Sequence, residues 1–394
     1  MDIKRSMAMA TELTRAGKLR EATEMLQSLM KSPDASTAAA STARGHTDAI
    51  EGVFSRVGQE QPRPPAAAAE RPVATPRTKP RAGLAETLRK IAAGGMPAHG
   101  MKTTQDPDLP PGAQFLSARH GSPHGQRNYR LYIPAKTTEL PMPLIVMLHG
   151  CTQTAEDFAI GTGMNAVAED LGFMVVFPMQ PSGANAQKCW NWFRPEDQVR
   201  GRGEPALIAG MVSDILRNHP VDPARVYIAG LSAGAAAAVI AASAYPEMFS
   251  AVGAHSGLAA GSARDVASAF ATMRSGTAGK PHKTAVPTIV FQGLSDTTVH
   301  PQNGHAVIAQ AVQSMAGLRK VGVAEASISG RKVHRTAHQD DSGRTMAELW
   351  EIEGAGHAWA GGNAQGSYTD PTGPDASRQM VRFFLQHVKA TTAS

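Results

Sequence analysis

The chain has only two cysteines, Cys151 and Cys189, among its 394 residues. This excludes a disulfide scaffold, and it excludes a structural zinc site, which needs four ligands in paired clusters. No apolar run approaches the length of about 20 residues that a transmembrane helix requires. Residues 1–20 carry scattered charges and no uninterrupted apolar segment, so no secretory signal is recognisable and a cytoplasmic location is expected. No zinc finger, RNA-binding signature or basic recognition helix is present, which argues against a nucleic-acid partner.

The positive charge of the chain is concentrated near its N-terminus. Residues 1–100 carry +5 of the formal net charge of +6. Apolar residues at helical spacing predict an amphipathic helical segment over residues 1–32. Residues 33–112 are rich in proline, alanine and arginine and predict a flexible linker, because they offer too little apolar surface to fold. We expect the helical segment to bind a partner protein or a granule surface, with an anionic membrane as an alternative.

A glycine-rich turn carries the candidate nucleophile. An apolar run over residues 225–229 leads into Gly230-Leu-Ser-Ala-Gly234, and an alanine-rich helical run follows. This order of strand, sharp turn and helix is typical of a nucleophile elbow, in which the glycines permit a strained turn that exposes the serine hydroxyl. Ser232 is therefore the predicted nucleophile, although the pattern alone also fits an ordinary glycine-rich helix start.

Two further residues complete a candidate catalytic triad. Asp296 and His357 each follow an apolar run, and glycines flank the histidine. Both are expected at the edge of a parallel sheet where catalytic groups collect. The order Ser232, Asp296, His357 is that of α/β-hydrolases, in which the imidazole accepts the hydroxyl proton and the acid orients the imidazole. His300 is the one alternative base that we retain, and Asp296 taken alone also fits a turn residue.

The oxyanion hole is expected to consist of two backbone amides. Attack on an ester carbonyl places negative charge on oxygen, and fixed N–H groups stabilise that charge. One donor is the residue after the nucleophile, Ala233. The second comes from the loop after an earlier strand. An apolar run ends at His149-Gly150-Cys151, so Cys151 is the best candidate, with an ordinary β-turn as the alternative.

The alternation of apolar runs and helical patterns predicts an α/β fold over residues 113–390, with a mostly parallel sheet flanked by helices and an antiparallel first strand at one edge. Strands are expected near residues 127–133, 143–148, 172–177, 225–229, 250–254, 287–291 and 345–352. Helices are expected near residues 155–170, 204–217, 234–244, 302–315 and 376–388.

The region from about residue 115 to residue 387 resembles the poly(3-hydroxybutyrate) depolymerase family of serine esterases, a branch of the α/β-hydrolases that is similar to feruloyl and acetylxylan esterases. The resemblance rests on Leu148-His-Gly-Cys-Thr-Gln153, Cys189-Trp-Asn-Trp-Phe193, Arg200-Gly-Arg-Gly-Glu-Pro205, Gly230-Leu-Ser-Ala-Gly234, Ala254-His-Ser-Gly257, Gly356-His-Ala-Trp359 and Ser367-Tyr-Thr-Asp-Pro371.

This resemblance implies the same triad, Ser232, Asp296 and His357, and the same oxyanion amides. It also implies that Cys151 and Cys189 lie together beside the active site. Secreted relatives bridge the equivalent cysteines, whereas a reducing compartment would keep them as thiols. Members of the family are commonly exported, which conflicts with the missing signal.

The chain departs from the family pattern at two positions in the motifs, Ala235 and Gln292, where relatives often carry glycine and histidine. We assign neither position a chemical role. The sequence ends shortly after a helical pattern over residues 376–387, whereas secreted polymer depolymerases usually continue into a linker and a substrate-binding module. We therefore expect soluble esters or oligomers rather than solid polymer as substrates.

The predicted function is hydrolysis of short-chain hydroxyalkanoate esters or oligomers by two-step acyl transfer, without a metal or an organic cofactor. Trp190, Trp192 and Trp359 flank the catalytic motifs, and we expect them to line an apolar acyl pocket or else to pack in the core. The alternatives are a feruloyl or acetylxylan esterase and, from another class, a catalytically idle protein that binds a granule or a partner.

Overall fold

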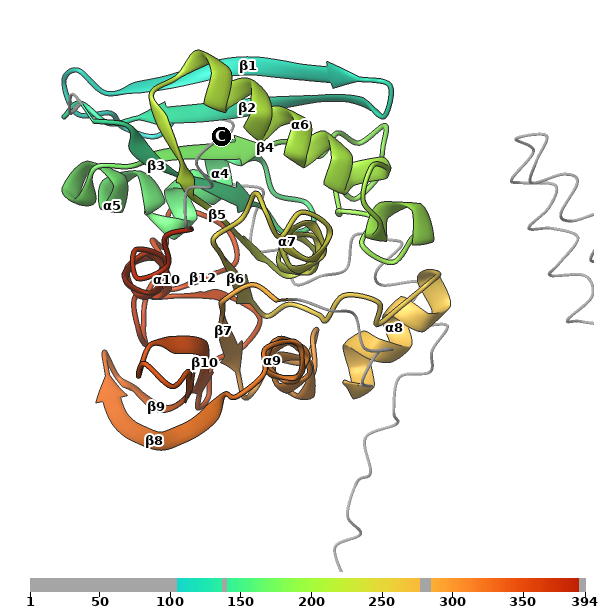
Figure 1. Cartoon of the computed structure of the whole chain (residues 1–394), viewed down its shortest axis with the longest axis vertical. Coiled ribbons are helices and arrows are strands. Elements are labelled where there is room, and N and C mark those ends of the chain that lie inside the picture. Colours follow the sequence, from blue (N-terminus) through green and yellow to red (C-terminus); the bar gives the residue numbers. More distant parts are fainter. Residues whose placement is uncertain (1–104, 137–139, 277–284, 390–394) are drawn as a thin grey trace, which may run out of the picture. The chain divides into compact units, whose positions relative to one another are not determined.

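The structure is a computed structural model that describes residues 105–136, 140–276 and 285–389 (Figure 1). The predicted helical segment over residues 1–32 lies outside the described residues, as does most of the predicted linker over residues 33–112. Within the described ranges, no helix is both long enough and apolar enough to cross a membrane.

A ten-stranded sheet forms the centre of the described chain, with the order β1-β2-β4-β3-β5-β6-β7-β10-β9-β8. Neighbouring strands from β4 across to β10 are parallel, whereas β1 and β2 at one end and β9 and β8 at the other are antiparallel. The mostly parallel sheet expected from the sequence is confirmed. The strands are β1 (Gln114–Ser122), β2 (Gly125–Ile133), β3 (Met142–Leu148), β4 (Met174–Pro178), β5 (Val221–Leu231), β6 (Ala251–His255), β7 (Thr288–Gly293), β8 (Arg319–Ile328), β9 (Arg331–Gln339) and β10 (Thr345–Ile352), and a small second sheet pairs β11 (Trp359–Ala360) with β12 (Thr369–Asp370).

The two ends of the sheet differ from the expectation. The strand expected near residues 127–133 is β2, and it is antiparallel as predicted, but it is not the edge because β1 pairs outside it. At the other end, β8 and β9 form a hairpin that was not expected at all. Strands β1, β8 and β9 carry many polar residues and expose part of their surface, so they lack the continuous apolar runs that mark doubly covered strands.

Both faces of the parallel strands are buried, which explains why these strands are apolar along their whole length. In β3, Leu144, Val146 and Leu148 pack into the cluster that also contains residues of α6, α7 and α9. Ile145 and Met147 point to the opposite face and pack with residues of α4, α5 and α10. Figure 1 shows α6, α7 and α9 on one side of the sheet and α5 and α10 on the other.

The helices are α4 (Ala155–Thr162), α5 (Met164–Leu171), α6 (Gly203–Asn218), α7 (Ala233–Ala244), α8 (Val266–Ser275), α9 (Gln302–Ser314) and α10 (Ala376–Phe384), with a 3₁₀ turn, η2 (Pro195–Gln198). The single helix expected over residues 155–170 is two helices, because Gly163 adopts a left-handed conformation with φ of 62° between them. The last helix ends at Phe384, earlier than expected. Helix α8 was not expected, although Asp265 and Ser268 form a capping box at its start.

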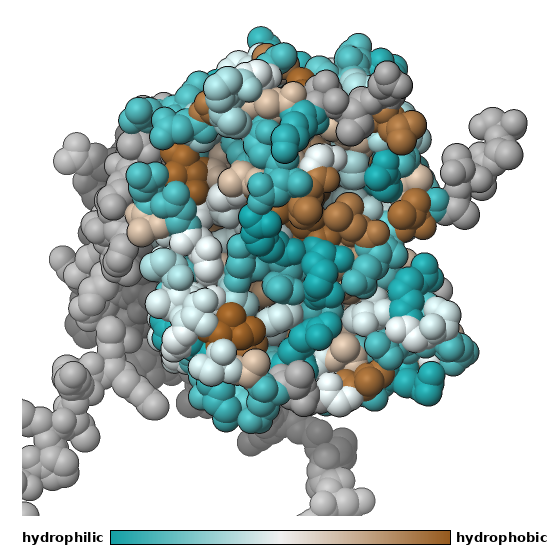
Figure 2. Space-filling model, turned by 90° about the vertical axis from the view of Figure 1, so that its left-hand side faces the viewer, coloured by the Kyte–Doolittle hydropathy of each residue, from teal (hydrophilic) through white to brown (hydrophobic). Residues whose placement is uncertain are grey.

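The surface beside α5 and α10 is mostly hydrophilic. Figure 2 views the molecule from this side, where apolar residues form small patches separated by hydrophilic ones. Exposed apolar residues of these elements and the chain just after them are Leu171, Leu385 and Val388. Scattered exposed apolar residues are normal on a protein surface, so this side points to no particular partner.

Candidate active site

Ser232 occupies a sharp turn between β5 and α7. Its backbone has φ of 57° and ψ of −120°, a conformation that is strained for any residue other than glycine. The Ser232 amide donates a hydrogen bond to the carbonyl oxygen of His255, 2.9 Å away, so the turn is fixed to the end of β6. This is the strand, turn and helix geometry that the sequence predicts for a nucleophile elbow.

The elbow requires glycine on both sides of the nucleophile. A Cβ atom added to Gly234 would lie 2.1 Å from the carbonyl oxygen of Leu148, and one added to Gly230 would lie 2.5 Å from the backbone of Gly234. The elbow therefore packs its backbone directly against the end of β3. The same contact brings the loop that follows β3, which begins at His149, next to the candidate nucleophile.

Asp296 and His357 form a hydrogen-bonded pair. Nδ1 of His357 lies 2.7 Å from Oδ2 of Asp296, and the aspartate side chain is fully buried. Because Nδ1 donates to the carboxylate, Nε2 is the ring nitrogen left to accept a proton. Among the described contacts, none joins the Ser232 hydroxyl to His357, and such bonds are often long in a free enzyme.

The loops that carry the acid and the base are bound to each other. The Leu294 amide donates to the carbonyl oxygen of Ile352 (3.0 Å), and the Ser295 amide donates to that of Ala355 (2.9 Å). Gly293 permits this approach, since a Cβ atom there would lie 2.5 Å from the carbonyl oxygen of Ala355. The parallel pairing of β7 with β10 thus continues beyond the strand ends and sets the distance between Asp296 and the histidine loop.

The surroundings of Asp296 keep it ionised. Burial raises the pKa of this carboxyl, but the hydrogen bond and charge of His357, with the amides of Val299 and Thr298, lower it below its ordinary value. Oδ1 accepts from those amides at 2.8 and 2.9 Å. Gln292, to which the sequence assigned no role, places Nε2 3.5 Å from Oδ2. Its contribution was missed because only the tertiary structure brings it to the acid.

His255 supports the base loop, a role that the sequence did not reveal. His255 is the last residue of β6 and is buried. Its Nε2 accepts a hydrogen bond from the Ala360 amide (3.0 Å), and its ring stacks on Trp359 and Phe291. Burial, with a smaller effect of the His357 charge, lowers its pKa to about 3, so it stays neutral. His255 therefore ties the chain just after His357 to the strand beside the elbow.

The predicted oxyanion donors have the required backbone setting. Ala233 is the first residue of α7, where an amide has no acceptor within its own helix. On the other loop, the Gly150 amide donates to Oε1 of Gln153 (2.9 Å) and the Thr152 amide donates to the carbonyl oxygen of Gln187 (2.7 Å). The Cys151 amide between them makes no hydrogen bond with any described residue, so it remains available to a ligand.

A disulfide bond joins Cys151 to Cys189, with their Cα atoms 4.2 Å apart. The sequence left this pairing open. The bond fixes the loop after β3 to the segment that follows β4, and Nε1 of Trp190 adds a hydrogen bond to the carbonyl oxygen of His149 (3.1 Å).

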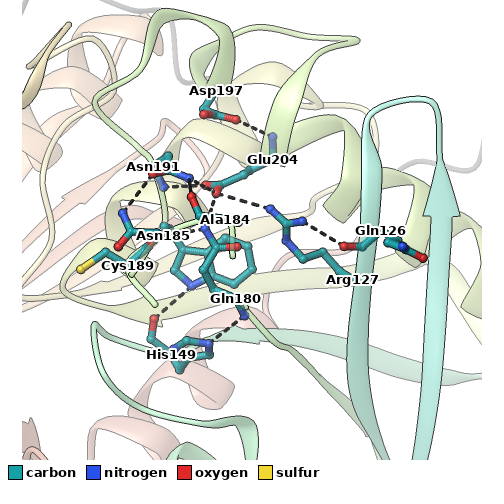
Figure 3. Close-up of polar contacts among 11 residues, drawn as sticks. Gln126, Arg127, His149, Gln180, Ala184, Asn185, Cys189, Asn191, Asp197 and Glu204 are labelled. Carbon is teal, nitrogen blue, oxygen red and sulfur yellow. Dashed lines mark hydrogen bonds and ion pairs between the residues drawn. The ribbon is translucent and has the colours of Figure 1, made fainter. Parts of the chain in front are cut away.

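A buried polar network lies behind the oxyanion loop (Figure 3). His149 donates from Nδ1 to the carbonyl oxygen of Gly150 (2.7 Å) and accepts at Nε2 from the Gln180 amide (3.1 Å). Burial lowers the pKa of His149 to about 4, so this ring is neutral. The Gln180 side chain donates to Glu204 (2.5 Å), which also accepts from the amide of Asn191 (2.7 Å). Glu204 thereby links the chain before Cys189 to the chain just after it.

The three tryptophans expected at an acyl pocket are all buried, with exposed fractions of 1% for Trp190 and Trp359 and 5% for Trp192. Trp190 lies beside His149, with ring centroids 5.8 Å apart, and Trp359 donates from Nε1 to Ser377. Their role in substrate binding stays a prediction.

The alternative base, His300, occupies a different setting. It is exposed, and its Nδ1 accepts from the Gln302 amide at 3.2 Å. The described contacts do not join it to Ser232 or Asp296, so His357 is the histidine that the structure pairs with the acid. In the described part of the chain, no group of three or more His, Cys, Asp or Glu side chains could hold a metal ion.

Comparisons with known proteins identify a family and several relatives. A family model described as Esterase PHB depolymerase matches residues 127–339. Poly(3-hydroxyalkanoate) depolymerase C of Paucimonas lemoignei is 35% identical over 231 residues, which cover 55% of this chain and 54% of the relative. Feruloyl esterase B of Thermothelomyces thermophilus is 32% identical over 200 residues, 46% of this chain and 67% of the relative. Acetylxylan esterase A of Talaromyces purpureogenus is 28% identical over 197 residues, 44% of this chain and 50% of the relative.

The chain thus spans about half to two thirds of the length of these curated relatives. Among solved structures, an acetyl xylan esterase from Aspergillus awamori superposes with a TM-score of 0.54 at 20% identity, covering 70% of this chain and 99% of that one. At this identity the match supports the α/β-hydrolase fold and says nothing about substrate.

Proposed function

The chain belongs to the Esterase PHB depolymerase family, and from this premise we propose that it is a serine carboxylic-ester hydrolase acting on short-chain hydroxyalkanoate esters or oligomers. The observation that carries the proposal is the buried Asp296–His357 pair beside a strained serine elbow. A buried acid that orients an imidazole has little structural use at a sheet edge, whereas a serine nucleophile requires this pair.

The proposed reaction has two steps. Ser232 attacks the ester carbonyl while Nε2 of His357 takes the hydroxyl proton, and Asp296 stabilises the imidazolium that forms. The amides of Cys151 and Ala233 hold the oxyanion. His357 then protonates the departing alkoxide, and water repeats the cycle to release the acid and free the serine.

This mechanism draws only on groups of the chain. The neutral state of His255 matters here, because a second positive charge beside the base would oppose formation of the imidazolium. The hydrogen bond from Gln292 to Asp296 holds the carboxylate in place from the other side.

Hydroxyalkanoate esters are the substrates that we favour, since the sequence relative with the longest match among those reported above is a poly(3-hydroxyalkanoate) depolymerase. A feruloyl or acetylxylan esterase is the alternative within enzymes. Relatives with those names also match the chain, although over shorter regions. The N-terminal segment over residues 1–32 is proposed to bind a partner or a granule surface, and a protein that only binds is the alternative from another class.

Labelling with a fluorophosphonate probe separates an enzyme from an idle binding protein. We expect stoichiometric labelling of the full chain and complete loss of labelling in Ser232→Ala. Ser213→Ala is the matched control, because in the described part of the chain the Ser213 hydroxyl bonds to its own helix alone, at the Ala209 carbonyl oxygen. Failure of the full chain to label, or equal labelling of Ser232→Ala, would contradict the proposal.

A panel of esters identifies the substrate class. Rates on 3-hydroxybutyrate oligomers, methyl ferulate and acetylated xylan are measured with the same enzyme preparation. We expect the highest kcat/KM on the hydroxybutyrate oligomers. A higher value on either plant cell-wall ester would replace the hydroxyalkanoate proposal with the corresponding esterase.

A further inference from the structure

A cavity of about 440 Å³ opens beside the oxyanion loop, at the end of the sheet formed by β1, β2 and β4. Its volume lies in the usual range for small-molecule sites, about 300–1,000 Å³. It is lined by Arg119, Gln126, Asn128, His149, Gln153, Thr154, Met179, Gln180, Pro181 and Lys188.

The cavity shares residues with the catalytic machinery. His149 and Gln153 belong to the loop that carries Cys151, and Lys188 directly precedes Cys189, its disulfide partner. A Cβ atom added to Gly150 would lie 3.6 Å from the carbonyl oxygen of Leu231, so this loop touches the elbow. A substrate with its ester carbonyl at the oxyanion amides could therefore extend into the cavity.

The cavity is positively charged. Arg119 and Lys188 both line it, and no carboxylate does. Neither cation forms an ion pair with an acid in the described ranges, unlike the nearby Arg127, which lies 3.7 Å from Glu204. His149 also lines the cavity. Burial lowers its pKa, and the nearby positive charge of Lys188 lowers it further. Arg119 and Lys188, two cations without an acidic partner in the described ranges, lie beside a neutral histidine and therefore attract an anion.

The walls are held in place by the backbone. Arg119 and Asn128 are direct partners across β1 and β2, and the Met179 amide donates to the Asn128 carbonyl oxygen (2.9 Å). On the opposite wall, Lys188 adopts a left-handed conformation with φ of 52°, and its amide donates to the Asn185 carbonyl oxygen (2.8 Å). A non-glycine residue fixed in this conformation is a feature of functional sites. Figure 3 shows His149, Gln180, Asn185 and Cys189 together on this side.

We propose that this cavity is a subsite for the free carboxylate end of a hydroxyalkanoate oligomer, with Lys188 and Arg119 binding the carboxylate. The inference rests on the proposed function. In a linear oligomer of hydroxy acids, the carbonyl of each ester belongs to the unit nearer the hydroxyl end, and the alkoxide oxygen belongs to the unit nearer the carboxylate. The carboxylate therefore always lies on the leaving-group side of the bond that is cut.

This subsite makes the enzyme selective for short products of polymer breakdown. A dimer or trimer places its charged end within one or two units of the scissile ester, whereas the interior of a long polyester is neutral. Met179 and Pro181 offer apolar contact to the aliphatic units, and the amides of Gln126 and Asn128 can donate to ester carbonyls. Methyl ferulate and acetyl groups carry no carboxylate and would gain nothing from the two cations.

The test compares two substrates that differ only in charge: the 3-hydroxybutyrate dimer as a free acid and the same dimer with a terminal carboxamide. We measure kcat/KM for both with the full chain, Lys188→Gln, Arg119→Gln and the double variant. We expect the full chain to prefer the acid by about tenfold at low salt, with each single variant lowering this preference about threefold. The preference should also shrink as salt is raised.

The control variant is Arg274→Gln, which removes an exposed cation on α8 that does not line the cavity. It should leave the preference unchanged. p-Nitrophenyl butyrate serves as a reference ester without a carboxylate, and the rates of each variant on the two dimers are expressed relative to its rate on this ester.

Each outcome decides a different point. Cleavage of p-nitrophenyl butyrate and the carboxamide dimer without preference for the acid overturns the subsite and leaves the proposed function standing. Equal losses on both dimers in Lys188→Gln and Arg119→Gln also overturn it, because the residues would then act through the fold. Cleavage of neither dimer overturns the choice of hydroxyalkanoate substrates itself.

Discussion

Cys151 and Cys189 are joined by a disulfide bond that spans 38 positions of the sequence. The first cysteine supplies a proposed oxyanion amide, and the second lies between the buried Trp190 and the cationic Lys188. The bond therefore couples the geometry of the oxyanion hole to the wall of the cavity beside it. Disulfides persist in oxidising environments, so this link is retained only outside a reducing compartment.

Loss of the disulfide should lower both stability and turnover. For the double variant Cys151→Ala, Cys189→Ala, we expect the free energy of unfolding to fall by about 4 kcal/mol, from the loop closed by the bond. We expect kcat to fall by about tenfold with little change in KM, because the Cys151 amide is held less firmly. Urea unfolding and ester kinetics measure the two effects, and unchanged kcat would show that the loop is fixed without the bond.

Asp296→Asn tests the acid of the triad. The amide leaves the imidazole without its carboxylate, so we expect kcat to fall by about three to four orders of magnitude while the protein stays folded. The pKa of Asp296 is lowered, so the carboxylate is present throughout the neutral and alkaline range. Titration of Asp296 itself should therefore add no pH dependence to the deficit between about pH 6 and 9.

The control for this variant is Asp341→Asn, an exposed aspartate in the turn between β9 and β10. It should retain full activity. Near-full activity of Asp296→Asn at neutral pH would argue against the assignment of Asp296 as the acid.

The sequence revealed the triad candidates because each depends on a local pattern. Ser232 lies in a five-residue motif, and Asp296 and His357 follow apolar runs that the structure shows to be β7 and β10. The supporting residues had no such signal. Gln292 and His255 become meaningful only when β6, β7 and β10 lie side by side, which is a property of the tertiary structure.

Two errors in the predicted fold have a similar cause. The periodicity of residues 155–170 is helical on both sides of Gly163, so sequence alone could not show that one helix ends there. The hairpin of β8 and β9 is paired at the sheet edge and partly exposed, and both of its strands contain charged residues. Only the pairing with β10 identifies it as part of the sheet.

Glu204 should make stability depend on pH. Burial and the charge of Asp197 raise its pKa to about 7, against hydrogen bonds from Asn191 and Gln180. Between its unfolded value near 4.5 and about 7, the folded protein holds a proton that the unfolded chain has lost. This contribution to stability is fully present below the unfolded value and is lost as pH rises, by up to roughly 3 kcal/mol.

The measurement is urea unfolding at several pH values between 5 and 8, for the full chain and Glu204→Gln. Because glutamine does not titrate, the free energy of unfolding of the variant should fall less with rising pH over this interval than that of the full chain. An equal decline in both proteins would assign the pH dependence to other groups.

Gly234→Ala should disrupt the elbow. The added methyl group would meet the Leu148 and His149 carbonyl oxygens at 2.1 and 2.5 Å, and neither can move without shifting the end of β3. We expect a loss of about 3 kcal/mol or more of stability and of nearly all activity. The matched control is Gly183→Ala, since a Cβ atom there meets nothing within 4 Å. Thermal unfolding and ester hydrolysis are measured for both variants. Equal stability and equal activity in the two would contradict the prediction.

Trp190→Phe tests the predicted acyl pocket. The substitution keeps an aromatic ring against His149. It removes the hydrogen bond that Nε1 of Trp190 donates to the carbonyl oxygen of His149. If Trp190 lines the pocket, the smaller ring should change the ratio of kcat/KM for acetate and butyrate esters by about threefold or more, because one methylene in an apolar pocket is worth about 1–3 kcal/mol. If Trp190 only packs in the core, both values should fall equally. Trp350→Phe is the control, since Trp350 is a buried tryptophan of β10 whose Nε1 donates to Glu348, and it should leave the ratio unchanged.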